Sequence, residues 1–351
     1  MTAPAAPQLA PHAGPIEKEA SRLLAEVSGA VQAVEIAKRS PVGAGAVKAE
    51  IAGDTAQVAD RLSSQDWIED VAVRPRHLYL GVEPTVLRAW LTREGPEILP
   101  LGEEGKQREP ADPTSGEAES LAAFRLEAVA EALARINTLP GAAQDSGTPA
   151  RPAVGAVDVR YGALRMRHGG VLGAEDAAEE LIEELDAAML AGLDPARFGH
   201  SALALLLLAT PYRKHIQVDD AWLRQGVAEI GDLVHALRAT PIADPPVKPS
   251  EKEVGRAVHL LAMELNGLPR KAGMAVERQE PAFLARFVLS LATLVEGAPL
   301  SNADPLRDVA AAALASSLKL LAAWPEQLLR GSRAAAARDS GGDRVEAQDV
   351  V

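Results

Sequence analysis

The segment from Arg165 to Leu185, RMRHGGVLGAEDAAEELIEEL, begins like a nucleotide-binding loop and continues as an acidic helical pattern. A loop that neutralises nucleotide phosphates commonly offers lysine ammonium groups as point charges. Here no lysine follows until Lys214, and the imidazole of His168 is mostly uncharged at neutral pH. The segment therefore has the outline of a phosphate-binding loop without the charge that such a loop requires.

Other patterns that could catalyse a reaction or bind a metal are absent or weak. The chain has no cysteine, which excludes disulfides, thiolate zinc sites and thiol nucleophiles. It contains neither an H-E-x-x-H zinc motif nor a G-x-S-x-G nucleophile elbow. The run VGAGAV at 42–47 is a lone G-x-G, which we expect to be an ordinary loop. We predict no catalytic residue, no cofactor and no metal, and we do not expect an enzyme.

Titratable side chains at helical spacing also have a structural explanation. Glu179 and Glu183 lie one turn apart, with nothing basic or apolar nearby to separate their acidities as acid–base catalysis requires. We expect a solvated acidic helix face there. Structural roles are likewise expected for the histidines within or beside predicted helices, namely His200, His215, His235 and His259.

The net charge limits the partners that the chain can bind. It is −13, from 36 Lys and Arg against 49 Asp and Glu, and such a charge repels a phosphate backbone unless the two signs are segregated. Residues 173–190 hold seven carboxylates and no Lys or Arg, whereas residues 250–338 hold eleven Lys and Arg against nine Asp and Glu. Nucleic-acid binding is thus permitted in the C-terminal segment without being required.

Residues 16–92 predict a small α+β module. The stretch 16–39 has apolar residues at helical spacing and predicts one amphipathic helix. A second helix is expected at 54–64, with Asp54 as its N-cap. Alternating apolar residues around a proline-bearing turn then predict a β-hairpin, followed by a helix with Pro84 in its first turn.

The rest of the chain predicts helices. Residues 93–153 are a linker with one helix at 117–137, residues 154–247 a helical stem-like region, and residues 248–330 a helical bundle. Pro and Gly residues delimit helices at 174–192, 196–209, 219–239, 250–266, 281–296 and 304–322. The predicted fold is therefore mostly α, with an N-terminal α+β module.

The two ends of the chain predict disorder. Residues 1–15 form a Pro- and Ala-rich arm without the features of a signal peptide, and residues 331–351 form a polar tail. The longest apolar run, ALALLLLA at 202–209, is far shorter than the ~20 residues that cross a bilayer. We expect a soluble, cytoplasmic protein that does not contact membranes.

Residues 58–91 resemble the end of the additional N-terminal domain of arginyl-tRNA synthetases. Where that family has the motif Gly-Pro-Gly-Phe, this chain has RPRH at 74–77. The matching positions are Val71, Val73, Leu78, Leu80, Leu87, Trp90 and Leu91.

Residues 165–215 are similar to the stretch of arginyl- and cysteinyl-type synthetases that begins at the lysine loop. The resemblance implies that Arg165, Met166, Arg167 and His168 form a degenerate nucleotide loop, because Arg167 and His168 replace the family's Ser-Lys. The family's His-Ile-Gly-His element has no counterpart beyond HAGP at 12–15, and the chain between Leu91 and Arg165 is too short for a nucleotide-binding domain. The positions that match the family are Arg165, Met166, Gly169, Val171, Leu181, Asp194, Pro195, Leu205, Leu206, Tyr212 and Arg213.

Residues 250–329 resemble the helical DALR anticodon-binding domain of arginyl-tRNA synthetases. EPAFLARFVLSLATLVEG at 280–297 and the run that ends in LKLLAAWPEQLL at 318–329 follow the family's patterns. The family's aromatic cluster is replaced by TLVEG, and its Asn-Gly by Ser316-Ser317. Aromatic faces are the surfaces on which unstacked RNA bases stack, so this replacement weakens base reading.

The resemblance implies a non-catalytic relative of arginyl-tRNA synthetase, involved in translation, that binds tRNA through DALR-like helices. The side chains predicted to contact RNA are Arg286, Arg307, Lys319, Tyr212, Arg213 and Lys214. The alternative is a scaffold subunit that does not bind RNA. In that case the acidic helix at 174–190 would dock on a basic partner, such as a synthetase, and the net charge favours this alternative.

Overall fold

The computed structural model describes residues 8–9, 12–28, 31–37, 40–42, 46–94, 120–139, 159–161, 173–238, 249–322, 324 and 328. Within these residues the protein is mostly helical, with one largely antiparallel sheet and one pair of short parallel strands. The chain forms two compact units. Unit 1 comprises Met1–Leu99, Ile242–Arg270 and Gly297–Ala310, and unit 2 comprises Pro100–Pro241, Lys271–Glu296 and Ala311–Val351.

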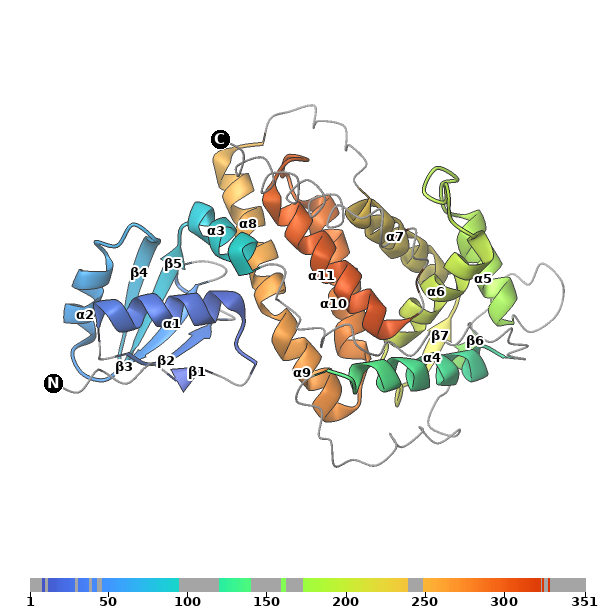
Figure 1. The fold of residues 1–351 in the computed structure, drawn as a ribbon, viewed down its shortest axis with the longest axis horizontal. Helices are drawn as coiled ribbons and strands as arrows, with labels where there is room; N and C mark the ends of the chain where they lie inside the picture. The colour runs from blue at the N-terminus through green and yellow to red at the C-terminus, as the bar shows by residue number, and fades with distance from the viewer. Residues whose placement is uncertain are drawn as a thin grey trace, which may run out of the picture. The chain divides into compact units, whose positions relative to one another are not determined.

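Unit 1 contains a five-stranded sheet (Figure 1). The strands lie in the order β1-β2-β3-β5-β4, and all neighbours are antiparallel except β1, which is parallel to β2. The strands are β1 (Gln8–Leu9), β2 (Val31–Ile36), β3 (Val47–Ile51), β4 (Ile68–Arg74) and β5 (His77–Val82). In β5, Leu78 and Leu80 are fully buried on one face, the period-two pattern of a half-covered sheet.

Four helices pack in unit 1: α1 (Pro15–Val27), α2 (Thr55–Leu62), α3 (Pro84–Glu94) and α8 (Glu251–Asn266). Helix α1 contacts β2, α3 and α8, whereas α2 contacts β4 and β5 (Figure 1). The apolar stripe Ile16, Ala20 and Leu24 of α1 is buried. Spacing of three to four residues places such a stripe on one helix face, which is why α1 can cover the sheet.

Most of the N-terminal prediction is confirmed, one part is wrong, and strands β1 and β3 were not predicted. Asp54 caps α2 by accepting the N–H groups of Ala56 and Gln57, the β4–β5 hairpin turns at Pro75–Arg76, and Pro84 opens α3. The single helix predicted at 16–39 instead ends at Val27, and Val31–Ile36 forms strand β2. The error arises because Val31 and Val34 fit the helical period, although pairing with β3 places them in the sheet.

Unit 2 is built from helices and one short strand pair. Its elements are α4 (Leu121–Ile136), α5 (Ala174–Glu183), α6 (Pro195–Leu208), α7 (Asp220–Leu237), most of α10 (Ala282–Gly297), parts of α9 (Leu268–Arg278) and α11 (Pro305–Leu321), and the parallel strands β6 (Val159–Tyr161) and β7 (Ile216–Val218). Asp194 and Asp219 cap α6 and α7. One apolar cluster joins α4, α5, α6 and β7 through Leu121, Ala174, Ala177, Ala178, Leu203, Leu207, Ile216 and Val218.

The helices predicted in the C-terminal part are confirmed, with two differences. Helix α5 ends at Glu183 instead of residue 192, and the Asp186 carboxylate accepts the Ala188 N–H, a local bond that competes with the helix. Helix α9 was not predicted, because Gly267 and Pro269 resemble a break. Pro269 lies in the first turn of α9, where its missing N–H costs nothing.

Several predictions fall outside the described residues. These are most of the arm at 1–15, the linker segments 95–119 and 140–158, the loop at 162–172 and the tail at 331–351. The segment 248–330, predicted as one bundle, contributes residues to both units. Among the described helices, none is long and apolar enough to cross a membrane.

Candidate nucleic-acid interface

The loop Ala209–His215, which connects α6 to β7 in unit 2, is held in place by the buried guanidinium of Arg125. This side chain extends from α4 and is 0% exposed. Its Nη1 donates to the Lys214 carbonyl at 2.9 Å, and its Nη2 donates to the carbonyls of Thr210 and Pro211, each at 3.0 Å. Hydrogen bonds from a charged donor are stronger than neutral ones, so Arg125 fixes the path of the loop.

Helix α10 and Glu280, which precedes it, supply two further contacts to the same loop. The Glu280 carboxylate accepts the Tyr212 N–H at 3.3 Å. The Arg286 Nε donates to the Ala209 carbonyl at 2.6 Å, while the Arg286 side chain stays exposed. The loop is thereby attached to α10 at its first residue, and to Glu280 near its middle.

The carboxyl group of Glu280 lies in a partly buried environment. Burial raises the pKa of Glu280, and the N–H groups of Tyr212 and Ala282 act in the opposite direction, as do the charges of Arg125 and Arg213. Burial disfavours the ionised form of a carboxyl group, and positive neighbours favour it. Glu280 is therefore a partly buried carboxyl group that lies close to the positive charges of Arg125 and Arg213.

Tyr212 and Arg213 form a stacked pair on the loop. The Tyr212 ring is buried, at 9% exposure, and the guanidinium carbon of Arg213 lies 5.4 Å from its centroid. The Nε of Arg213 donates to the Tyr212 hydroxyl at 3.2 Å, and this bond raises the pKa of Arg213. A cation over an aromatic face is stabilised by the ring quadrupole, so the Arg213 guanidinium is held in position although it is exposed.

The loop therefore presents several cationic side chains to solvent. Arg213, Lys214 and Arg286 are exposed and are attached to the loop or belong to it, and we call these three residues the basic cluster. His215 is exposed beside them. Three of the six residues predicted from sequence to contact RNA are thus brought together by the fold.

The other three predicted residues have different surroundings. Tyr212 is buried beneath Arg213. Lys319 is exposed near the end of α11, where its carbonyl accepts a hydrogen bond from Arg135. Arg307 lies in unit 1 at 4% exposure, with Nη2 donating to the carbonyls of Ala298 and Leu300. The prediction that Arg307 contacts phosphate is corrected, since its guanidinium bonds the chain's own carbonyls in the interior.

Sequence reasoning missed Arg125 and Glu280. Arg125 falls on the buried stripe of α4 that contains Leu121, Ala128 and Val129, so an arginine inside an apolar helical stripe was the available signal. Glu280 carried no comparable signal, because the proximity of Tyr212 depends on tertiary packing. The degenerate nucleotide loop, Arg165, Met166, Arg167 and His168, lies outside the described residues.

Within the described ranges, no group of three or more His, Asp or Glu side chains is arranged to hold a metal ion. The exposed carboxylates of α5, among them Glu175 and Glu179, project from a helix whose buried face is Ala174, Ala177, Ala178 and Leu181. Their arrangement is that of a solvated acidic face.

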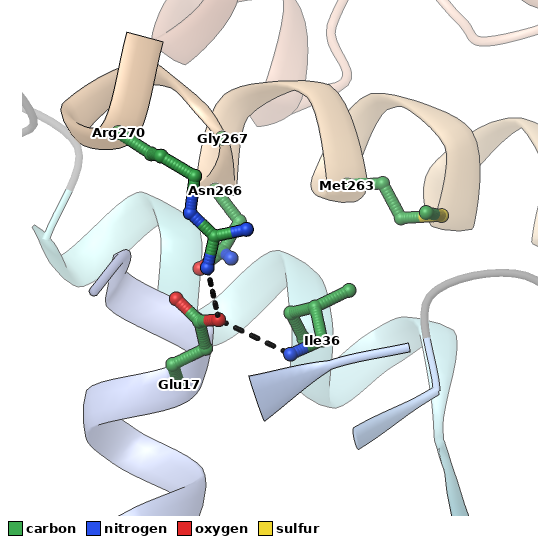
Figure 2. A pocket seen from close by; sticks show the side chains of 6 residues that line it. All are labelled: Glu17, Ile36, Met263, Asn266, Gly267 and Arg270. Atoms are coloured by element: carbon green, nitrogen blue, oxygen red, sulfur yellow. Dashed lines mark hydrogen bonds and ion pairs between the residues drawn. The ribbon is translucent and has the colours of Figure 1, made fainter. Parts of the chain in front are cut away.

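A small polar pocket in unit 1 lies where the start of α1 meets the end of α8 (Figure 2). The Glu17 carboxylate accepts the N–H groups of Gly14 at 2.8 Å and Ile36 at 3.1 Å, and it lies 3.5 Å from the guanidinium of Arg270. The Asn266 side-chain oxygen accepts the Ile16 N–H at 2.9 Å. These polar groups form hydrogen bonds and an ion pair with one another, so the role of the pocket is structural: its residues connect α1, β2 and α8.

Comparison with known proteins identifies no relative: no protein-family model matches the chain, and neither a curated protein nor a solved structure is significantly similar to it.

Proposed function

We propose that this chain is a non-catalytic relative of arginyl-tRNA synthetases that binds tRNA through the basic cluster of unit 2. The observation that carries the proposal is the attachment of Arg213, Lys214 and Arg286 to one loop whose path is fixed by the buried Arg125. The helices α8 to α11 lie within residues 250–329, the segment whose sequence resembles a DALR-type domain. tRNA is the partner class that the sequence resemblance implies.

The chemistry of the cluster suits a phosphate backbone. An arginine fork can donate two parallel hydrogen bonds to one phosphate and can also stack on a base, whereas lysine contributes a mobile point charge. Arg213 is held by the Tyr212 hydroxyl and Arg286 by the Ala209 carbonyl, so two of the three cations lose little conformational freedom on binding. The local charge counteracts the repulsion expected from a chain of net charge −13.

The proposal is tested by fluorescence anisotropy with the purified full chain at two salt concentrations. The ligands are total tRNA, an arginine-accepting transcript and the same transcript with a scrambled anticodon. Binding should weaken steeply with salt, because each phosphate contact adds roughly 0.7 to 0.9 to the log-log slope. The triple variant Arg213→Gln/Lys214→Gln/Arg286→Gln should lower that slope by about two to three.

The matched control is Arg61→Gln, which removes an exposed cation of α2 in unit 1 and should change the slope by less than one contact. Absence of binding at low salt would overturn the proposal. Equal behaviour of the triple variant and the control would also overturn it. Discrimination of the anticodon would show in addition that bases are contacted.

A second candidate function follows from the acidic face of α5. Glu175, Asp176 and Glu179 are exposed on this helix, and no Lys or Arg lies between residues 173 and 190. Such a face attracts a basic protein surface and steers its association. If the chain is a scaffold, Glu175→Lys/Glu179→Lys should slow association with an arginyl-tRNA synthetase at low salt, while the triple variant of the basic cluster should leave it unchanged.

A further inference from the structure

Among the described strands of unit 1, β4 lies at an edge of the sheet. In the order β1-β2-β3-β5-β4, formed by the described strands, β4 pairs on one side with β5. An edge strand presents a row of N–H and C=O groups that can pair with another strand. The opposite edge differs, because the two-residue strand β1 lies against β2 there.

The outward-facing backbone groups of β4 can be assigned from one hydrogen bond. The Val71 N–H donates to the Asp70 carboxylate at 2.8 Å, so this N–H points away from β5. Backbone groups of a strand alternate in direction with a period of two residues, and the groups of Val73 therefore point to the same side. Val71 and Val73 therefore carry the backbone groups through which this edge can pair with another strand.

The side chains of the same two residues form an incompletely covered apolar strip. Val71 lies opposite Leu80, and Val73 lies opposite Leu78, so all four share one face of the sheet. Leu78 and Leu80 are fully buried, but Val73 is 45% exposed. The apolar face of the sheet is therefore only partly covered at the β4 edge.

We propose that two copies of this chain associate by antiparallel pairing of their β4 strands, centred on Ala72. The sequence Asp70-Val71-Ala72-Val73-Arg74 is self-complementary in this register. Val71 and the partner's Val73 exchange hydrogen bonds through their outward-facing groups, and the two-fold axis repeats the exchange. Asp70 then lies opposite the partner's Arg74 on one face, while the valines cover one another on the other face.

Other registers lose one of these features. A shift that centres the pair on Val71 places Asp70 opposite the partner's Ala72, and one centred on Val73 places Val71 opposite the partner's Pro75, which has no N–H. A slip of one residue along a single strand would reverse the faces of the valines. Charge, hydrogen bonding and apolar cover therefore coincide when the pair is centred on Ala72.

The single copy carries features that protect this edge from other strands. Glu69 lies at a register shift between Ile68 and Asp70, and the Asp70 carboxylate caps the Val71 N–H. Bulges and charged side chains at an edge discourage unspecific pairing. In the pair, the partner's Val73 carbonyl replaces the carboxylate at the Val71 N–H, and the carboxylate turns to the partner's Arg74.

The test is sedimentation velocity of the full chain over a concentration series, without RNA, so that the result is independent of the proposed function. The wild type should show a reversible dimer. Asp70→Arg and Arg74→Asp should each raise the dissociation constant at least about tenfold, because each sets two like-charge pairs across the strands. The double variant Asp70→Arg/Arg74→Asp should restore the dimer.

The control Asp60→Arg reverses an exposed charge on α2 and should not change the dissociation constant. Circular dichroism and thermal unfolding establish that each variant is folded. A wild type that stays monomeric up to about 200 μM would overturn the inference, since that concentration detects free energies of association near 5 kcal/mol. A folded double variant that fails to dimerise while the wild type does would overturn the proposed register.

Discussion

Replacing Arg125 by Met tests whether this buried guanidinium organises the loop Ala209–His215. The substitution keeps the aliphatic volume and removes three hydrogen bonds, of 2.9, 3.0 and 3.0 Å, to loop carbonyls. Bonds from a charged donor contribute about 1.5 to 3 kcal/mol each, which gives an upper bound of about 5 to 9 kcal/mol. Met also removes the cost of burying the charge, several kcal/mol. We expect a net loss of about 2 to 4 kcal/mol in the free energy of unfolding.

The measurement combines urea unfolding with hydrogen exchange of the amides from Tyr212 to His215. Exchange should accelerate in the loop before it does in α7, because the lost bonds hold the loop specifically. Arg125→Lys keeps the charge without the fork and should give an intermediate loss. The control Arg224→Met changes an exposed arginine of α7 and should stay within about 0.5 kcal/mol. A loss below about 1 kcal/mol with unchanged loop exchange would refute the reasoning.

Four further predictions concern other parts of the chain. Gly14→Ala should destabilise unit 1 by about 1 to 3 kcal/mol in urea unfolding, since the added Cβ would lie 2.1 Å from the Asn266 carbonyl oxygen. Gly231→Ala in α7 should instead stabilise the protein by about 0.5 to 1 kcal/mol, because the added Cβ would meet nothing nearer than 3.8 Å. Burial raises the pKa of Glu280, so the folded state holds the proton more tightly than the unfolded state does. Stability therefore falls as the pH rises from the ordinary pKa of a glutamate to the raised pKa of the folded protein, and Glu280→Gln should remove this pH dependence in unfolding curves. Ser250→Ala should cost about 1 kcal/mol and raise the pKa of Glu253 in NMR titration, because the Ser250 hydroxyl and N–H lower it.

The local elements of the fold were accessible from the sequence. Asp54, Asp194 and Asp219 begin their helices because an N-cap carboxylate bonds N–H groups two or three residues away. The hairpin at 68–82 follows from alternation around a proline-bearing turn. The failure at Val31–Ile36 has the same origin, because a short apolar pattern fits both a helix and a strand until its neighbour is known.

The candidate site was accessible only in part. Tyr212, Arg213 and Lys214 are consecutive residues and can be found from the sequence. The contact of their loop with Arg286, through the Ala209 carbonyl, depends on α10 packing near the end of α6. From the sequence alone, Arg307 and Arg286 were both predicted to contact RNA, although Arg307 is buried and Arg286 is exposed. Burial of a long cationic side chain is decided by the carbonyls that surround it, and those come from distant or irregular segments.

The same division applies to the β4 edge. The self-complementary run Asp70–Arg74 is a property of the sequence by itself, as are the amphipathic helices and their caps, because each depends on residues a few positions apart. Only the tertiary structure decided that this run lies at the margin of the sheet, that Arg125 is enclosed and that three cations share one loop. These outcomes depend on contacts between residues far apart along the chain, which local spacing does not determine.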